Sequence, residues 1–153
     1  MTVCTFAGHR EIYLSMIDEK IRKALNELLQ NDTEFIFYTD SMGDFDKKCE
    51  SAVRTLKKEN PDLRIQLIFV LPYMTNRLNN EKEYFDTYYD DVIIPAELDE
   101  VHYKAAIKKR NRWMADRAEY VLAYVHCDFG GAFDTVKYAQ QKEKQVLNLA
   151  VNG

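Results

Sequence analysis

Positive charge is in short supply in this chain, which carries 21 lysine and arginine residues against 25 aspartate and glutamate residues over 153 positions. Domains that bind nucleic acid usually present an excess of basic residues. The net charge of −4 therefore argues against a nucleic-acid partner. It leaves room for a small anionic ligand, because a local pocket can be positive on an acidic protein.

Cysteines and long apolar runs are also scarce. The three cysteines, Cys4, Cys49 and Cys127, are odd in number and follow no metal or redox spacing, so we expect reduced thiols, no metal and no cofactor. No stretch approaches the ~20 apolar residues of a membrane-spanning helix. The first apolar run, 3–7, is too short for a signal peptide. These absences predict a cytoplasmic protein with no membrane partner.

Apolar runs alternate with helical patterns from one end of the chain to the other. This order predicts one domain over residues 1–153, with an α/β fold: a three-layer Rossmann-like sandwich around a mostly parallel central sheet of about five strands. We expect strand 3–7 at the centre of the sheet, between strands 34–39 and 119–125. Further strands are expected at 63–73 and 145–151, with a short strand or extended piece at 91–95. Helices are expected at 12–29, from Asp44 or Asp46 to Pro61, at 101–117 and at 132–143.

Residues 74–91 form the one irregular zone, polar and rich in aromatic residues. Two interpretations are open: an active-site flap, or a solvated helix and loop, of which the second is favoured.

Four of the five glycines follow apolar strands. Gly8 follows the first strand, Gly43 the second, and Gly130 and Gly131 the strand at 119–125. In open α/β sheets, ligands bind at the carboxyl ends of the strands. Glycine there lets the backbone approach a ligand and leaves helix N-terminal amides free to hold an anion. The alternative is that these glycines only make tight turns, but their distribution favours a shared site.

Charged and polar residues accompany these glycines, among them His9, Arg10, Asp46 and Thr135. Such a rim suits a ligand with phosphate and sugar hydroxyls, since arginine pairs with phosphate and carboxylates accept from hydroxyls. Taken singly, each of these charged residues is also compatible with a solvated loop. Arg10 is also compatible with an exposed ion pair to Glu11 or Asp46. His9 is a proton shuttle, a phosphate donor or a structural side chain. The same loops also hold Asp40, Ser41, Asp44, Asp128 and Asp134.

Arg110 occupies an unusual position in the helix expected at 101–117. It lies four residues from both Ala106 and Met114, on a stripe that should face the sheet. An arginine on that side needs an anionic partner. The partner is either an internal carboxylate or the phosphate of a ligand.

Five segments of the chain, in order, resemble the SLOG superfamily of Rossmann-like proteins, and in particular its YpsA-like branch of small bacterial proteins. The segments are CTFAGHRE, TDSMGDFDKKCESAV, LIFVLPY, KKRNRWMADRAEYVLAYV and GGAFDTVKYAQQKEKQVLNL. The wider superfamily includes the LOG phosphoribohydrolases, which activate cytokinins, and the DNA-processing protein DprA. The resemblance implies a nucleotide-type ligand site at the strand ends.

The resemblance also implies which residues bind the ligand. Its motifs match Gly8, His9, Arg10, Gly43, Asp46, Arg110, Gly130, Gly131 and Thr135. One departure bears on chemistry, because Tyr138 stands where the phosphoribohydrolases carry a glutamate, and Phe129 replaces the proline before the glycines. The carboxylate that those enzymes use to cleave the N-glycosidic bond is therefore missing from its usual place.

Three functions follow from these observations. The favoured one is binding or sensing of a nucleotide-derived ligand, such as a nucleoside phosphate, a nucleotide sugar or an ADP-ribose-like molecule. The second is an N-glycosidic-bond hydrolase or transferase in which Asp46 or Asp134, or else Asp44, replaces the missing glutamate. The third is a protein-interaction module with a vestigial pocket. The oligomeric state stays open, with a homodimer among the options.

Overall fold

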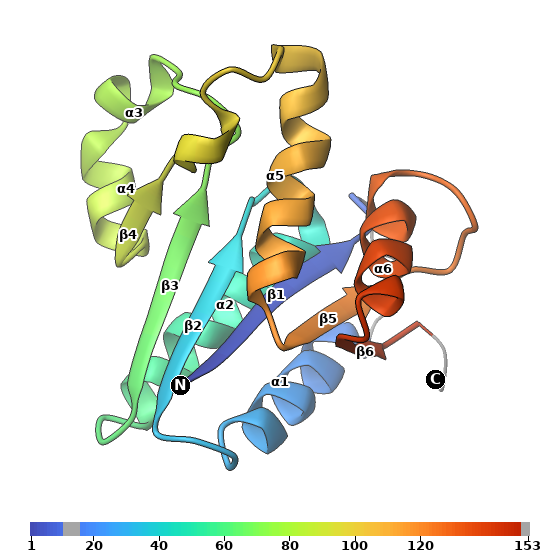
Figure 1. Cartoon of the computed structure of the whole chain (residues 1–153). Coiled ribbons are helices and arrows are strands. Elements are labelled where there is room, and N and C mark those ends of the chain that lie inside the picture. The colour runs from blue at the N-terminus through green and yellow to red at the C-terminus, as the bar shows by residue number, and fades with distance from the viewer. Residues whose placement is uncertain (11–15, 151–153) are drawn as a thin grey trace.

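The computed structural model describes residues 1–10 and 16–150 and has a parallel sheet at its centre (Figure 1). The six strands lie in the order β4-β3-β2-β1-β5-β6, and every neighbouring pair is parallel. Strand β1 (Thr2–Gly8) pairs with β2 (Glu34–Thr39) on one side and β5 (Tyr120–Tyr124) on the other. The α/β fold and the central position of the first strand are confirmed. The sheet has six strands rather than about five.

The other elements follow the predicted order. The strands are β3 (Arg64–Val70), β4 (Asp91–Ile93) and β6 (Gln145–Asn148). The helices are α1 (Ile17–Leu28), α2 (Asp44–Glu59), α3 (Arg77–Asn80), α4 (Lys82–Tyr88), the 3-10 helix η1 (Ala96–Leu98), α5 (Tyr103–Arg117) and α6 (Gly131–Gln141).

Most element boundaries differ from the expected ones by one or two residues, and three larger differences concern α1, β3 and β6. The helix expected at 12–29 begins at Ile17, with Met16 as its N-cap, and residues 12–15 of the expected range lie outside the described part of the chain. Strand β3 ends at Val70 instead of running to residue 73, and Pro72 has no amide to extend a ladder. Strand β6 ends at Asn148, and residue 151 of the expected strand is outside the described residues.

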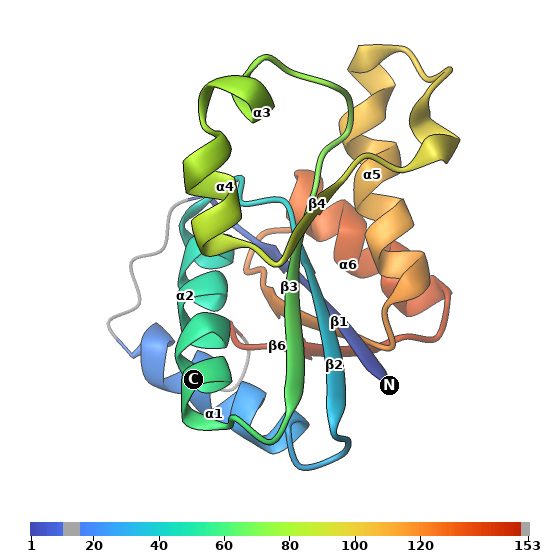
Figure 2. The same ribbon diagram turned by 90° about the vertical axis from the view of Figure 1, so that its left-hand side faces the viewer.

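Helices cover both faces of the sheet, which gives the three layers seen in Figure 2. Successive strand side chains point to opposite faces, and β2 shows this clearly. Phe35 and Phe37 pack in the cluster formed with α1 and α2, whereas Ile36 and Tyr38 pack against Met114 and its neighbours on α5. Strand β2 therefore contributes side chains to two hydrophobic cores, one on each face of the sheet. This explains why the strands appear in the sequence as continuous apolar runs.

Residues 74–91 contain α3 and α4, in agreement with the favoured prediction of a helix and loop. The segment is anchored by Phe85 and Tyr89, whose ring centroids lie 5.3 and 5.0 Å from that of Phe69 on β3. Among the helices that the structure describes, none is long and apolar enough to cross a membrane.

The parallel arrangement brings the carboxyl ends of all strands to one edge of the sheet. The loops that follow β1, β2 and β5 are joined there by backbone hydrogen bonds. The amide of Asp44 donates to the carbonyl of Arg10 (2.9 Å), and the amide of His9 donates to the carbonyl of Tyr124 (3.3 Å). Three segments far apart in the sequence thus meet at this edge.

Gly8 sets how closely α2 approaches the central strand. A Cβ atom at Gly8 would lie only 2.3 Å from Cδ2 and 2.5 Å from Cβ of Phe45, a fully buried residue in the first turn of α2. A contact with Cβ cannot be relieved by rotating the ring. Gly8 is therefore required by packing at the junction of β1 and α2.

We predict that Gly8→Ala lowers the free energy of unfolding by about 1–3 kcal/mol, the usual cost of overpacking. Gly131→Ala is the matched control, because a Cβ there would meet nothing within 4 Å, and its effect should stay within about 0.5 kcal/mol. Urea denaturation of both variants measures the difference. Equal midpoints would show that α2 shifts freely away from the strand.

Candidate functional site

A cavity of about 240 Å³ lies at the carboxyl edge of the sheet. It is enclosed by the end of β1, the loops after β2 and β5, one side of α5 and the first turns of α2 and α6. Its lining residues are Phe6, Ala7, Gly8, His9, Arg10, Asp40, Met42, Asp46, Ile107, Asn111, Met114, Phe129, Gly130, Gly131, Ala132 and Thr135. Most of the residues predicted from the glycine loops lie around this one cavity.

Arg10 supplies positive charge at the mouth of the cavity, and its side chain is exposed. The backbone of this residue packs on Gly43, where a Cβ atom would come within 2.7 Å of the Arg10 Cα. Gly43 is absent from the cavity lining. Its role is to let the β2–α2 loop pack closely against the backbone of Arg10. Within the described part of the chain, no ion pair joins Arg10 to Asp46. Glu11, the other surface partner considered, lies outside the described residues.

The N-terminus of α6 also lines the cavity. Gly130 has φ 97°, a left-handed conformation that favours glycine. The first amides of a helix have no partner within it and carry partial positive charge. The Thr135 hydroxyl donates to the carbonyl of Gly131 (3.0 Å) and closes this first turn. Together with Arg10, this helix start makes one end of the cavity suitable for an anion.

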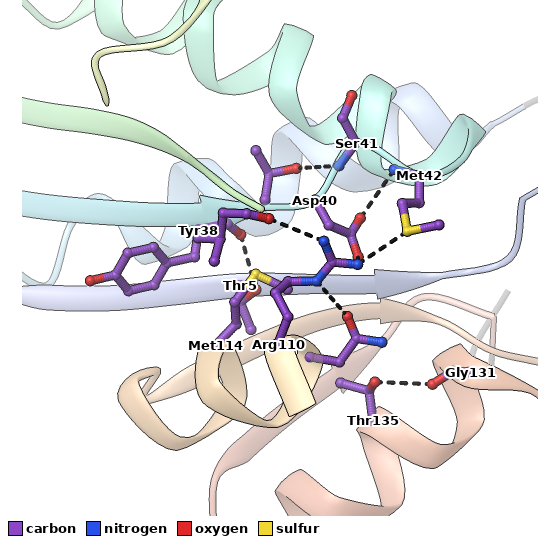
Figure 3. Close-up of polar contacts among 12 residues, drawn as sticks. Thr5, Tyr38, Asp40, Ser41, Met42, Arg110, Met114, Gly131 and Thr135 are labelled. Carbon is purple, nitrogen blue, oxygen red and sulfur yellow. Dashed lines mark hydrogen bonds and ion pairs between the residues drawn. The ribbon is translucent and has the colours of Figure 1, made fainter. Parts of the chain in front are cut away.

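Arg110 does not line the cavity, contrary to the expectation that it reaches in from its helix. Arg110 is only 1% exposed, and its guanidinium lies beside Asp40 and Met42 (Figure 3). The guanidinium pairs with the Asp40 carboxylate (3.4 Å) and donates to the carbonyl of Val70 (3.1 Å), to Asn111 Oδ1 (3.0 Å) and to the sulfur of Met42 (3.1 Å). Of the two partners left open by the sequence, the structure shows the internal carboxylate.

Asp46 is the unusual group of the cavity. Its side chain is 6% exposed, and its Oδ1 has no hydrogen-bond partner among the described residues. Burial, and after it the nearby negative charge of Asp40, raises the pKa of the Asp46 carboxyl well above its ordinary value. Burial and a neighbouring carboxylate both favour the neutral form of a carboxyl group. The Oδ1 atom of Asp46 is thus a polar atom that the described part of the folded chain leaves unsatisfied.

A second polar network holds the β2–α2 loop in place. The carboxylate of Glu50, which is almost fully buried, accepts from the Thr39 hydroxyl (2.7 Å), the Ser41 hydroxyl (3.3 Å) and the Tyr89 hydroxyl (2.6 Å). Ser41 has φ 55°, a strained conformation for a residue other than glycine. The bond to Glu50 stabilises this strained turn, which positions Asp40 and Met42.

His9 fixes the loop after β5. Its Nε2 accepts a hydrogen bond from the His126 amide (3.0 Å), and burial, followed by the charge of His126, lowers its pKa. Of the three roles open from the sequence, this hydrogen bond matches the structural one.

Two other candidate carboxylates lie away from the cavity. Asp44 and Asp134 are exposed, and neither belongs to the lining. The Tyr138 hydroxyl donates to Asp116 on α5 (2.7 Å), so this side chain also points elsewhere. Among the residues predicted for catalysis, only Asp46 lines the cavity.

The sequence analysis missed the wall that α5 contributes. Ile107, Asn111 and Met114 occur at spacings of four and three, a helical face that the periodicity could have revealed. It also missed Phe129, whose ring is 72% exposed at the start of the Gly130–Gly131 turn. A large aromatic ring in solvent beside a cavity is a candidate stacking surface.

A protein-family model described as the YspA SLOG family matches residues 2–151. The chain belongs to this SLOG family. The match spans nearly the whole sequence and confirms the resemblance carried by the five segments. Among curated proteins, none matches this SLOG chain.

Two solved structures of DNA processing protein A share the fold. The protein from Streptococcus pneumoniae is 15% identical with a TM-score of 0.63, and the alignment covers 95% of this SLOG chain and 49% of that protein. The protein from Helicobacter pylori is 18% identical with a TM-score of 0.64, over 99% of this chain and 67% of that one. The SLOG chain thus spans about half to two thirds of these proteins. At such identities the likeness establishes a common fold.

The Helicobacter pylori protein has a single-stranded DNA binding mode.

The unsatisfied carboxyl predicts a pH-dependent stability. The folded-state pKa of Asp46 is raised, so Asp46 destabilises the fold at neutral pH, and this penalty disappears below about pH 4, where the unfolded chain is protonated too. Asp46→Asn should raise the free energy of unfolding at pH 7, because the amide cannot ionise and therefore carries no such penalty. The gain should fall towards zero near pH 4.

Urea denaturation of the wild type and the variant at pH 7, 5.5 and 4 measures this dependence. Asp62→Asn, at an exposed aspartate in the turn after α2, is the control and should differ from wild type by less than about 0.5 kcal/mol. A gain at Asp46 that is independent of pH would refute the protonation argument.

Proposed function

We propose that this protein binds a nucleotide-derived small molecule in the cavity at the carboxyl edge of the sheet. The observation that carries the proposal is the buried Oδ1 of Asp46, unpartnered within the described residues, in the wall of a cavity whose other end is positive. An unsatisfied buried polar group costs about 1–3 kcal/mol. A ligand hydroxyl bonded to Asp46 would remove that cost, which gives the protein a physical reason to favour the bound state.

The positive end of the cavity suits a phosphate. Arg10 presents an exposed guanidinium, a group that binds phosphate through two parallel hydrogen bonds. The amides at the start of α6 add partial positive charge, and Gly130 and Gly131 carry no side chain that would keep the ligand away from them. The Arg10 guanidinium and the α6 amides are thus two independent kinds of donor for the anion that we propose in this cavity.

The remaining walls suit a sugar and a base. Asp40 and Asp46 lie where they can bond to ribose hydroxyls, and the exposed ring of Phe129 offers a surface for stacking a base. The volume of about 240 Å³ is slightly below the usual range of about 300–1,000 Å³ for small-molecule sites. It therefore suits a sugar phosphate held inside, with the base at the open mouth. Nucleoside phosphates, nucleotide sugars and ADP-ribose-like molecules all contain this unit.

Single-stranded DNA is the second candidate ligand, and one observation favours it: the Helicobacter pylori protein of the same fold binds single-stranded DNA. A single strand would use the same phosphate and base contacts but needs a longer basic track along its backbone. The net charge of −4 and the two aspartates of the cavity favour the small molecule. Direct comparison of the two ligand types decides between them.

The state of the carboxyl groups favours binding over cleavage of the N-glycosidic bond. That reaction needs a free carboxylate to stabilise an oxocarbenium-like transition state. The Asp40 carboxylate is already paired with Arg110, and the raised pKa of Asp46 favours the neutral form of that group. Neither is free to offer a negative charge to a sugar.

Arg10→Ala tests the phosphate position. It should weaken nucleotide binding by about 1.5–3 kcal/mol, the range for a hydrogen bond to a charged group, or about 10–150-fold in Kd. The melting temperature of the unliganded protein should stay nearly unchanged, because the side chain is exposed. Isothermal titration with AMP, ADP-ribose and UDP-glucose measures the first effect, and thermal denaturation the second.

Arg64→Ala is the matched control, since Arg64 is an exposed arginine at the start of β3, on the opposite edge of the sheet. It should bind nucleotides as the wild type does. A fluorescent oligothymidylate is titrated in parallel. If the oligonucleotide binds and no nucleotide does, the single-stranded DNA candidate replaces the small molecule; if Arg10→Ala and Arg64→Ala bind alike, the phosphate position is wrong.

We expect no hydrolase activity. Incubation with nucleoside monophosphates should release little or no free base, because Tyr138 replaces the glutamate of the related hydrolases, Asp40 is paired with Arg110 and the raised pKa of Asp46 favours its neutral form. Chromatographic detection of free base checks this. Turnover on the order of 1 per second, a common enzymatic scale, would establish the enzyme instead; Asp46→Asn would then show whether that carboxyl takes part.

A further inference from the structure

Three side chains capable of binding a transition metal lie together beside the cavity. The side chains of His9, His126 and Cys127 each offer one ligand atom, and these atoms all lie within 4.8 Å of one another. His9 and Cys127 are half-buried and His126 is exposed. In residues 1–10 and 16–150 no other group of three histidine, cysteine or acidic side chains fits that description.

The sheet itself creates this cluster. Gly8 and Tyr124 are register partners on β1 and β5, so the residues that follow them leave the sheet side by side. The amide of His126 donates to Nε2 of His9 (3.0 Å), which ties the two loops together. The centroids of the two imidazole rings lie 4.4 Å apart, and Sγ of Cys127 is 3.4 Å from Nδ1 of His126. The side chains are therefore already assembled.

We propose that His9, His126 and Cys127 form a binding site for one divalent zinc-class ion. Two imidazoles and one thiolate are a borderline-soft donor set, which suits Zn²⁺ and Co²⁺ better than Mg²⁺ or Ca²⁺. Three protein ligands leave the fourth tetrahedral position open to water or another ligand. Atoms already within 4.8 Å of one another need only small side-chain rotations to close on an ion.

The neighbours of the cluster are compatible with this site. Binding through Nε2 of His9 exchanges its hydrogen bond to the His126 amide for a bond to the metal, and the ion then joins the same two loops. The other two cysteines, Cys4 and Cys49, are buried in the core. The third histidine, His102, caps α5 through a bond from the Lys104 amide (3.2 Å). None of these residues competes for the ion.

Cobalt(II) is the probe for this site, used on reduced, tag-free protein without added nucleotide. One equivalent should give the thiolate-to-cobalt charge-transfer band and the intense visible bands of tetrahedral Co²⁺, and Zn²⁺ should abolish both. X-ray absorption of the zinc-loaded protein should show one sulfur at about 2.3 Å and nitrogens at about 2.0–2.1 Å. A spectrum of six oxygen ligands would overturn the proposal.

Cys127→Ser and His126→Ala identify the ligands. Loss of an outer-shell partner already weakens metal binding about 10–100-fold, so loss of a ligand should raise the Kd for Zn²⁺ at least about tenfold, measured by competition with a chelating dye. Cys127→Ser should also remove the charge-transfer band. His102→Asn, which keeps a good capping residue, should bind as the wild type does.

Folding does not confound this test, because His126 is exposed and Cys127 is only half-buried, and circular dichroism with thermal denaturation verifies each variant. Equal Zn²⁺ affinity in the wild type and Cys127→Ser would show that the cluster is held together by packing alone. Since no nucleotide is used, the outcome is independent of the function proposed for the cavity.

Discussion

The buried guanidinium of Arg110 constrains the whole carboxyl edge of the sheet. A charge removed from water needs a partner, and this one finds Asp40 at the end of β2 and the carbonyl of Val70 at the end of β3. Helix α5 can therefore dock only where both lie within reach of its arginine. Removing one partner of a buried ion pair typically costs about 3–5 kcal/mol. This pair thus fixes the back of the cavity, although its arginine never reaches the cavity surface.

The same pair determines the charge that a ligand meets. Arg110 pairs with Asp40, and burial, together with the proximity of Asp40, raises the pKa of Asp46 and favours its protonated form. Two carboxyl groups in the wall consequently present less negative charge than their number suggests. The positive charge of Arg10 and of the α6 N-terminus remains available at the other end. The cavity is polarised towards an anion, although the protein as a whole is acidic.

The likeness to DNA processing protein A illustrates how little a fold decides about chemistry. Both DprA chains align with nearly all of this sequence, yet at most 18% of the aligned residues are identical. The parallel sheet and the crevice at its carboxyl edge belong to the fold. What the crevice can bind depends on individual side chains, such as Arg10, Asp46 and Phe129. The histidine and cysteine cluster beside the crevice likewise depends on individual side chains.

The sequence by itself determined the order of the elements and the edge at which the cavity lies. Both follow from local signals: hydrophobic periodicity, and glycines such as Gly8 and Gly130 that come directly after apolar strands. Only the tertiary structure decided that Arg110 pairs with Asp40, that Asp46 Oδ1 lacks a partner among the described residues, and that His9 meets Cys127. These arrangements join residues far apart in the chain and depend on side-chain direction and burial. A hydrophobic pattern contains no information on which polar groups will face each other across the sheet edge, because that choice is made only when the helices pack.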